Sequence, residues 1–367
     1  MYDPNVVGLD MRYKVVGGRE TRDWAICVQV LEKKPMSALS VGGLHIPPAV
    51  ETLTADPGVS AARELTPTDV IEVGHPVLHE GFEGWYSRPA WGGLGIGILD
   101  DTGTKMLTGT MTVVNWGGPD RILSAGHVLS TRRTTDGFRD EVAPSTLIFQ
   151  PPDGIEMVPP GEWKASKMKI GLMENGYPLF RYPVGHLGPY YFNTYDLAWA
   201  RPRRGATSYA IGPGDLSPVW PQPKMSIVIK NVDTIPQMTD MGTHGGPAYG
   251  LRVAFAGVST GLHEGRIKTV RSLLKTWGHN RTCYYCFRDL IRVEPTFGGV
   301  PEPGDSGSML VGLGTKSGTG LGTLVGGNAQ SVYFARIPTA NPGSGLLQQP
   351  PYAPGPNPPL GGGTQSI

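Results

Sequence analysis

Glycine and proline interrupt this chain so often that long helices are disfavoured over most of its length. The 367 residues include 53 glycines and 35 prolines, and both residue types break helices and favour turns. Between the turns lie short apolar runs rich in Val, Ile and Tyr, a composition typical of strands. Many short strands joined by turns predict a mostly β chain folded as a barrel or a sandwich. The runs span 94–99, 105–116, 121–129, 196–200, 225–232, 251–258, 308–313, 321–327 and 331–337.

Composition divides the chain into three zones. Residues 1–85 are expected to form a small N-terminal extension, α/β or β, with strands at 25–32 (AICVQVLE) and 67–74 (PTDVIEVG). Residues 86–340 hold the strand-like runs and form the main domain. Residues 341–367 are rich in Pro and Gly with few charges, which predicts a disordered tail.

One segment of the main domain has helical spacing. In 265–277 (GRIKTVRSLLKTW) the apolar residues Val270, Leu273, Leu274 and Trp277 recur at steps of three and four, which predicts a helix. A strand followed by a loop is the alternative interpretation.

Charge and hydropathy exclude several classes of function. The net charge is +1, from 32 basic and 31 acidic residues, and no basic run indicates a nucleic-acid partner. No run of 18 apolar residues exists, so no membrane span is expected. The first residues lack the apolar core of a secretory signal, which predicts a cytoplasmic protein. A homo-oligomer is compatible with all of these features.

The sequence Gly-Asp-Ser-Gly at 304–307 has two interpretations. A short glycine-rich polar stretch is usually a turn. The other interpretation is a nucleophilic serine, Ser306, because flanking glycines let the backbone turn its N–H groups towards a developing oxyanion. A serine nucleophile also needs an imidazole base and a carboxylate that orients it.

Base and acid candidates occur in a consistent order. The chain has eight histidines and none follows Ser306, which excludes the hydrolase order in which the histidine comes last. His127 lies where the apolar run RILSAGHVL enters a turn of small residues, and is the favoured base. Asp196 lies between the two and opens the run DLAWA. A solvated histidine and an ordinary strand-end aspartate remain the alternatives.

These three segments resemble motifs of the trypsin/chymotrypsin-like serine peptidases. GDSG matches the family's nucleophile motif. LSAGHVL resembles its A-A-H-C segment, although Gly126 precedes the histidine and Val128 replaces the cysteine. YDLAWA resembles the D-[IL]-A-L strand that carries the family's aspartate.

The resemblance implies a chymotrypsin-like fold of two barrels, the first at about 92–205 and the second at about 215–340. It also implies a serine endopeptidase that cleaves polypeptides through an acyl-enzyme and needs no cofactor or metal. In that reaction His127 is the base, Asp196 orients it and Ser306 is the nucleophile.

Further site residues follow from the resemblance alone. The N–H groups of Gly304 and Ser306 would form the oxyanion hole. Val300 would lie at the floor of the substrate pocket, while Gly326 and Gly327 would border the backbone of the substrate. Because Val300 is uncharged, a preference for basic side chains is not expected.

A narrower resemblance covers the N-terminal zone. The segments KVVGGRETRDWAICVQVLEKKP and PTDVIEVG are similar to an N-terminal extension of intracellular bacterial and plant trypsin-like peptidases. VVGG at 15–18 also resembles the start of mature secreted trypsins, which cleavage at a basic residue creates. By that resemblance, the new α-amine of Val15 would pair with Asp305. Since Val15 lies far ahead of His127, we interpret VVGG as a local strand and turn.

Two alternatives remain open. His279, Cys283 and Cys286 lie close together in HNRTCYYC, which is compatible with half of a zinc site or a local disulfide; unpaired thiols are the favoured interpretation. The alternative to an active peptidase is a catalytically silent or self-processing protease-like domain used for binding or assembly.

Overall fold

A computed structural model describes the chain in segments. The described residues are 3–17, 19–34, 45–54, 62–74, 76–78, 90–99, 106–114, 121–130, 132–133, 138–150, 168–184, 191–204, 207–211, 227–228, 231–232, 249–278, 282–313, 319–328 and 330–337. The predicted tail at 341–367 and the predicted boundary after residue 85 lie outside them. Among the described residues, no helix has the length and apolar character needed to cross a bilayer.

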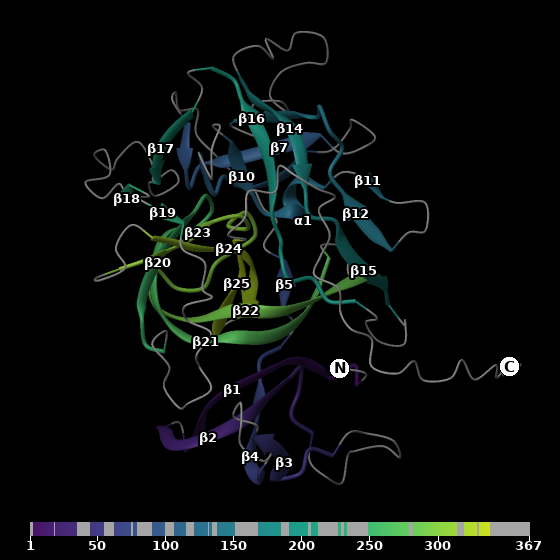
Figure 1. The fold of residues 1–367 in the computed structure, drawn as a ribbon, viewed down its shortest axis with the longest axis vertical. Coiled ribbons are helices and arrows are strands. Elements are labelled where there is room, and N and C mark those ends of the chain that lie inside the picture. The colour runs from purple at the N-terminus through teal and green to yellow at the C-terminus, as the bar shows by residue number, and fades with distance from the viewer. Residues whose placement is uncertain are drawn as a thin grey trace, which may run out of the picture.

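The first barrel occupies the upper part of Figure 1. Its seven strands form an antiparallel sheet in the order β8-β7-β13-β14-β16-β10-β9. Only Met111 and Thr112 separate β8 from β9, so the two ends of the sheet belong to one chain segment and the sheet closes on itself. The strands are β7 (Gly95–Leu99), β8 (Met106–Thr110), β9 (Val113–Val114), β10 (Ile122–Ser124), β13 (Leu147–Phe149), β14 (Lys169–Gly176) and β16 (Ala198–Pro202).

The second barrel lies below the first in Figure 1. Its strands follow the order β22-β25-β24-β23-β20-β21, and a further pairing of β21 with β22 closes the ring. The strands are β20 (Arg252–Gly257), β21 (Gly261–Trp277), β22 (Cys283–Phe297), β23 (Met309–Gly312), β24 (Thr319–Asn328) and β25 (Ser331–Arg336).

Each barrel encloses an apolar core of its own. Ile96, Ile98 and Ile122 are buried in the first, and Phe255 and Phe334 are buried in the second. Alternation sends one face of each strand inward, and burying apolar surface is the main favourable term in folding. The predicted mostly β, two-barrel fold is therefore confirmed, while the predicted domain boundaries stay predictions.

The two barrels pack against each other through a third apolar cluster. Leu123 and Trp199 contribute from the first barrel, and Met309 and Val311 from the second. On β23 the neighbouring Leu310 points instead into the core of the second barrel. This strand is thus apolar on both faces and fixes the segment that precedes it, which contains Ser306, at the boundary between the barrels.

The predicted helix at 265–277 is wrong, because this segment belongs to the strand β21. From Gly261 to Ile267 buried and partly exposed residues alternate, as in a regular strand. Beyond Ile267 the pairing of β21 with β22 shifts register at three places. The first two of these shifts place an extra residue in β21 and the third places one in β22. An extra residue interrupts the alternation of a strand, so Val270 and Leu274 are both buried although their spacing is helical.

The N-terminal zone is a β extension of the second barrel (Figure 1). Its strands β2 and β4 contain the predicted strands at 25–32 and 67–74, apart from their last two residues, and confirm them. Gly8 and Leu9 of β1 pair with Leu274 and Leu273 of β21, so the sheet of the barrel continues into the extension. The strands are β1 (Val6–Val16), β2 (Arg19–Val30), β3 (Ala49–Thr54), β4 (Ala62–Glu72) and β5 (Val77–Leu78).

A buried polar chain ties the extension to the second barrel. Asp10 forms an ion pair with Arg292, with 2.9 Å between Asp10 Oδ2 and Arg292 Nε. Gln29 donates to Asp10 at 3.3 Å and accepts from the Tyr333 hydroxyl at 2.6 Å. Since removing one partner of a buried ion pair leaves an uncompensated charge, the first two strands are an integral part of the fold.

The remaining elements are short. β6 (Ala90–Gly92), β17 (Thr207–Ile211) and β18 (Ile227–Val228) form a separate small sheet, and β19 (Asn231–Val232) pairs with β24. β11 (Arg132–Arg133), β12 (Arg139–Glu141) and β15 (Leu179–Pro183) extend the large sheet beyond β22. α1 (Gly126–Leu129) is a helix of one turn that follows β10.

Candidate active site

His127 lies in the one-turn helix α1, where the first barrel meets the second. No side chain caps the start of this helix, so its first N–H groups need other acceptors. The His127 N–H donates to Asp196 Oδ1 at 2.9 Å. A Cβ atom on Gly126 would lie 3.1 Å from the same oxygen, which is a physical reason for a glycine at that position.

Asp196 lies two residues before β16 and is fully buried. Its Oδ2 lies 2.6 Å from His127 Nδ1. Its carbonyl oxygen accepts a hydrogen bond from the Thr323 hydroxyl of β24 at 3.0 Å. The side chain of Asp196 therefore contacts His127 of the first barrel, while its backbone carbonyl accepts a hydrogen bond from Thr323 of the second barrel.

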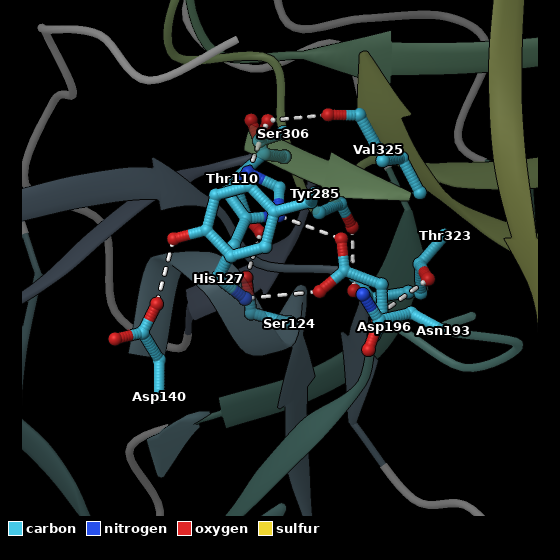
Figure 2. A network of polar contacts seen from close by, with 12 residues as sticks. Thr110, Ser124, His127, Asp140, Asn193, Asp196, Tyr285, Ser306, Thr323 and Val325 are labelled. Carbon is cyan, nitrogen blue, oxygen red and sulfur yellow. Dashed lines mark hydrogen bonds and ion pairs between the residues drawn. The ribbon is translucent and has the colours of Figure 1, made fainter. Parts of the chain in front are cut away.

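Ser306 precedes β23, and its hydroxyl faces the other ring nitrogen. Ser306 Oγ lies 2.8 Å from His127 Nε2 and 3.4 Å from the carbonyl oxygen of Val325. Figure 2 shows carboxylate, imidazole and hydroxyl in one line of contacts. His127 is thus within hydrogen-bonding distance of both Asp196 and Ser306, the other two residues selected from sequence motifs.

The backbone around Ser306 has a shape that depends on glycine. Gly304 and Gly307 have φ values of 108° and 93°, a region that favours glycine. A side chain at Gly307 would also collide with the Thr110 carbonyl oxygen. Among the described residues, neither the Gly304 N–H nor the Ser306 N–H has a hydrogen-bond acceptor. The loop thus carries two unused donors beside the serine hydroxyl.

Sequence reasoning missed the residues that hold this loop. Thr110 donates its backbone N–H to the Ser306 carbonyl at 2.7 Å and its hydroxyl to the Gly304 carbonyl at 2.7 Å. Thr323 and Val325 contact Asp196 and Ser306. These residues lie in ordinary strand sequence far from their partners, so no local motif marks them.

Asp305, the neighbour of Ser306, is fully buried and has its acceptors filled from within the chain. Its Oδ1 accepts from the backbone N–H groups of Ser259 at 2.9 Å and Thr260 at 3.2 Å. Its Oδ2 accepts from the Thr260 hydroxyl at 2.5 Å and the Glu302 N–H at 2.9 Å. Burial raises the pKa of Asp305, and these hydrogen bonds oppose that shift.

Val15, whose amine would pair with Asp305 in the trypsin-like interpretation, lies elsewhere. It belongs to β1, and its backbone N–H donates to Asp69 at 3.0 Å. β1 ends at Val16, and Gly17 follows with a φ of 57°, so the described part of VVGG, residues 15–17, is a strand end and a turn.

A buried histidine, His263, contacts Asp305 indirectly through the hydroxyl of Thr260. His263 Nε2 lies 2.5 Å from the Thr260 hydroxyl, and its ring stacks on Phe255 with 4.6 Å between centroids. An ionised Asp305 only accepts, so Thr260 donates to Asp305 and His263 Nε2 donates to Thr260. Burial lowers the pKa of His263 from 6.5 to about 4, which keeps the ring neutral near pH 7.

Acidification is expected to destabilise the fold through His263. His263 is protonated near pH 6.5 in the unfolded chain and only near pH 4 in the folded chain. The free energy of unfolding is therefore unaffected by His263 above pH 6.5 and declines as the pH falls from 6.5 to 4. The loss from this group is about 3 kcal/mol at pH 4. Denaturant unfolding at several pH values measures it. His263→Gln keeps a donor for Thr260 without titrating and should reduce the pH dependence by that amount; an unchanged pH dependence would refute this origin.

The residues predicted to bind substrate lie in two places: Gly326 and Gly327 lie within a sheet, and Val300 lines a cavity. Gly326 and Gly327 belong to β24 and pair with β25 on one edge and with β5 on the other. Val300 is 40% exposed and lines a cavity of about 690 Å³ together with the basic residues Arg12, Lys268 and Arg292.

Cys283 and Cys286 are buried free thiols, and burial raises the pKa of both. They are unpaired, as the favoured interpretation predicted, and the alternative of a local disulfide does not hold. His279 lies outside the described residues. Within the described part of the chain, no group of three or more His, Cys, Asp or Glu side chains is arranged to hold a metal ion.

Comparison with known proteins gives distant structural matches only. No protein-family model matches the chain, and no curated protein matches it significantly. Thermobifida fusca Protease A is 14% identical, with a TM-score of 0.38 over 67% of this chain and 91% of that one. Cellulomonas bogoriensis chymotrypsin is 17% identical, with a TM-score of 0.37 over 68% and 91%. A glutamic acid specific serine protease that uses a histidine triad in substrate binding is 15% identical, with a TM-score of 0.37 over 67% and 93%.

Proposed function

We propose that this protein is a serine endopeptidase in which Ser306 is the nucleophile, His127 the general base and Asp196 the group that orients the base. One observation carries the proposal. The two ring nitrogens of His127 lie 2.6 Å from a carboxylate oxygen of Asp196 and 2.8 Å from the hydroxyl oxygen of Ser306. A buried imidazole between a carboxylate and a hydroxyl is the arrangement that activates serine.

The first half of the reaction forms an acyl-enzyme. Ser306 Oγ bonds to the carbonyl carbon of the scissile peptide, and its proton passes to His127 Nε2. The carbonyl electron pair moves onto oxygen, which the N–H groups of Gly304 and Ser306 would stabilise. When this intermediate collapses, the C–N bond breaks, His127 gives its proton to the leaving amine, and an ester on Ser306 remains.

The second half releases the acid product. Water takes the place of the amine and gives a proton to His127 as it attacks the ester. Collapse of the second intermediate breaks the bond to Ser306, which takes back the proton from His127. Asp196 accepts from Nδ1 throughout, and this fixes the tautomer in which Nε2 is free to act as a base.

Formation of the ester can be measured directly. Mixing the protein with an activated acyl ester should release a burst of about one equivalent of alcohol per chain, since acylation of such esters outruns hydrolysis of the acyl-enzyme. Quenched samples should gain the mass of one acyl group. Ser306→Ala should show neither signal. A well-folded wild-type protein without burst or adduct would contradict the proposal.

A second function is favoured by one observation. Ser306 and Asp196 are both 0% exposed and His127 is 7% exposed, so a polypeptide reaches the hydroxyl only after neighbouring groups move. This burial favours a protease-like domain that is catalytically silent or processes only itself. Absence of the acyl adduct would select this alternative.

Two finer assignments belong to the same proposal. The β extension and its similarity to the N-terminal segment of intracellular trypsin-like peptidases support membership of that subgroup. A cytoplasmic location is the second of these assignments.

A further inference from the structure

The strand β5 lies against the segment expected to bind the backbone of a substrate. Leu78 pairs with Gly326 and Val77 pairs with Gly327, in antiparallel orientation. An extended peptide that adds to an open strand edge makes the same kind of ladder. The edge of β24 at Gly326 and Gly327 is thus already occupied by a segment of the same chain.

The opposite edge of β24 cannot take a peptide at this point, because it is paired with β25. Gly326 pairs with Tyr333 and Gly327 with Val332. A strand has two hydrogen-bonding edges. A substrate that pairs with these glycines must therefore use the edge that β5 holds.

The edge that β5 occupies also runs past Ser306. Leu324 exchanges backbone hydrogen bonds with this segment, donating to Ser308 and accepting from Gly307. The next residue, Val325, accepts from the Ser306 hydroxyl. Gly326, one step further along β24, pairs with Leu78. The segment that contains Ser306 and the strand β5 therefore contact the same edge of β24, one after the other. Their contacts are about one strand residue, or 3.3 Å, apart along β24.

The direction of β5 strengthens this relation. Because β5 is antiparallel to β24, the step from Val77 to Leu78 runs from Gly327 to Gly326, towards Val325 and Ser306. A bound substrate on the same edge in the same direction would carry its backbone towards the nucleophile.

β5 is also held on its other side. Val77 pairs with Trp277 of β21. The Pro76 carbonyl oxygen accepts from the Trp277 N–H at 3.4 Å and from the Thr276 hydroxyl at 3.2 Å. The segment thus bridges the second barrel instead of resting on β24 alone.

We propose that β5 occupies the binding site for the substrate backbone and competes there with polypeptides, so that the chain restrains its own peptidase activity. This inference rests on the proposed function. The site takes an extended polypeptide of either source, β5 or a separate substrate. If β5 is in place in 99% of molecules, the apparent affinity for a substrate falls about 100-fold. Displacing it should lower KM with little change in kcat.

Proline substitutions test the competition in the full chain. Proline lacks a backbone N–H and is not tolerated inside a ladder, so Val77→Pro combined with Leu78→Pro should release β5. We expect KM for a peptide substrate to fall at least 10-fold. Glu51→Pro combined with Thr52→Pro breaks the ladder between β3 and β4 and should leave KM unchanged. An unchanged KM in the folded β5 variant, or an equal fall in the control, would overturn the proposal.

A peptide of sequence HPVLHE, residues 75–80, adds a test in trans. It should inhibit the β5 variant more strongly than the wild type, whose site is filled from within. Equal inhibition of both proteins would speak against a shared site.

The wild-type chain provides a measurement that needs no proline variant. A peptidyl boronate that pairs with Gly326 and Gly327 should expel β5, and the amides of Val77 and Leu78 should then exchange hydrogen faster. Retained protection of these amides with the inhibitor bound would contradict displacement.

A small fluorophosphonate separates failure of this inference from failure of the proposed function. The reagent has no peptide backbone and so does not need the edge of β24. If it labels Ser306 while KM is the same with and without β5, only the competition is refuted. If Ser306 is never labelled, the peptidase assignment itself fails.

Discussion

Replacing Ser306 with alanine is expected to lower kcat for peptide hydrolysis by about 10⁶-fold, because the attacking atom is lost. His127→Ala should cost a similar factor, since the hydroxyl 2.8 Å away then has no base. The double variant should be no slower than either single variant, because the two residues act as one unit. Steady-state cleavage of a quenched fluorescent peptide, with folding checked by circular dichroism, measures all three.

Ser130→Ala provides the matched control for this series. Ser130 directly follows α1, and its hydroxyl has no hydrogen-bond partner among the described residues. Its removal should leave kcat within about twofold, as expected of a substitution that breaks no contact. A loss of less than tenfold in Ser306→Ala would mean that another group attacks the substrate.

Asp196→Asn is expected to lower kcat by about 10⁴-fold with little effect on KM. An amide in place of the carboxylate can donate to Nδ1, which favours the tautomer that carries its proton on Nε2 and cannot accept one from Ser306. The amide oxygen can still accept from the His127 N–H, as Oδ1 does now at 2.9 Å. The fold should therefore survive, and kcat and KM measured against pH report the loss.

Asp140→Asn is the control for the Asp196 variant. Asp140 is a partly buried aspartate, which accepts from the Tyr285 hydroxyl at 2.7 Å and pairs with Arg181 at 3.3 Å. It lies near the site in Figure 2 but makes no contact with His127 that is drawn there. If both variants lost activity equally, the effect of Asp196 would be one of general stability.

The positions of the three central residues were predictable because each lies in a short motif. Gly-Asp-Ser-Gly needs glycines to form its turn, and His127 and Asp196 mark the ends of apolar strands. The sequence therefore predicted which side chains meet, although their catalytic role remains a prediction. The mostly β fold was predictable for a similar reason, since strand patterns and turn residues are local.

Features that depend on distant pairing were not predictable. Thr110 contacts Gly304 across 194 positions, and nothing in its neighbourhood indicates this. Val270 and Leu274 are buried in a strand despite their helical spacing, because β21 shifts register against its partner β22, and these shifts depend on the partner strand. The pairing of Leu78 with Gly326 likewise depends on how the chain returns to the barrel after the N-terminal extension.

Covalent labelling tests the central claim, the linkage of Asp196, His127 and Ser306, most directly. The protein is treated with a fluorophosphonate, digested and mapped by mass spectrometry. We predict one adduct per chain, on Ser306, formed much more slowly in His127→Ala and Asp196→Asn. A folded protein that stays unlabelled, or whose Ser306 reacts equally fast without the imidazole, would contradict this account.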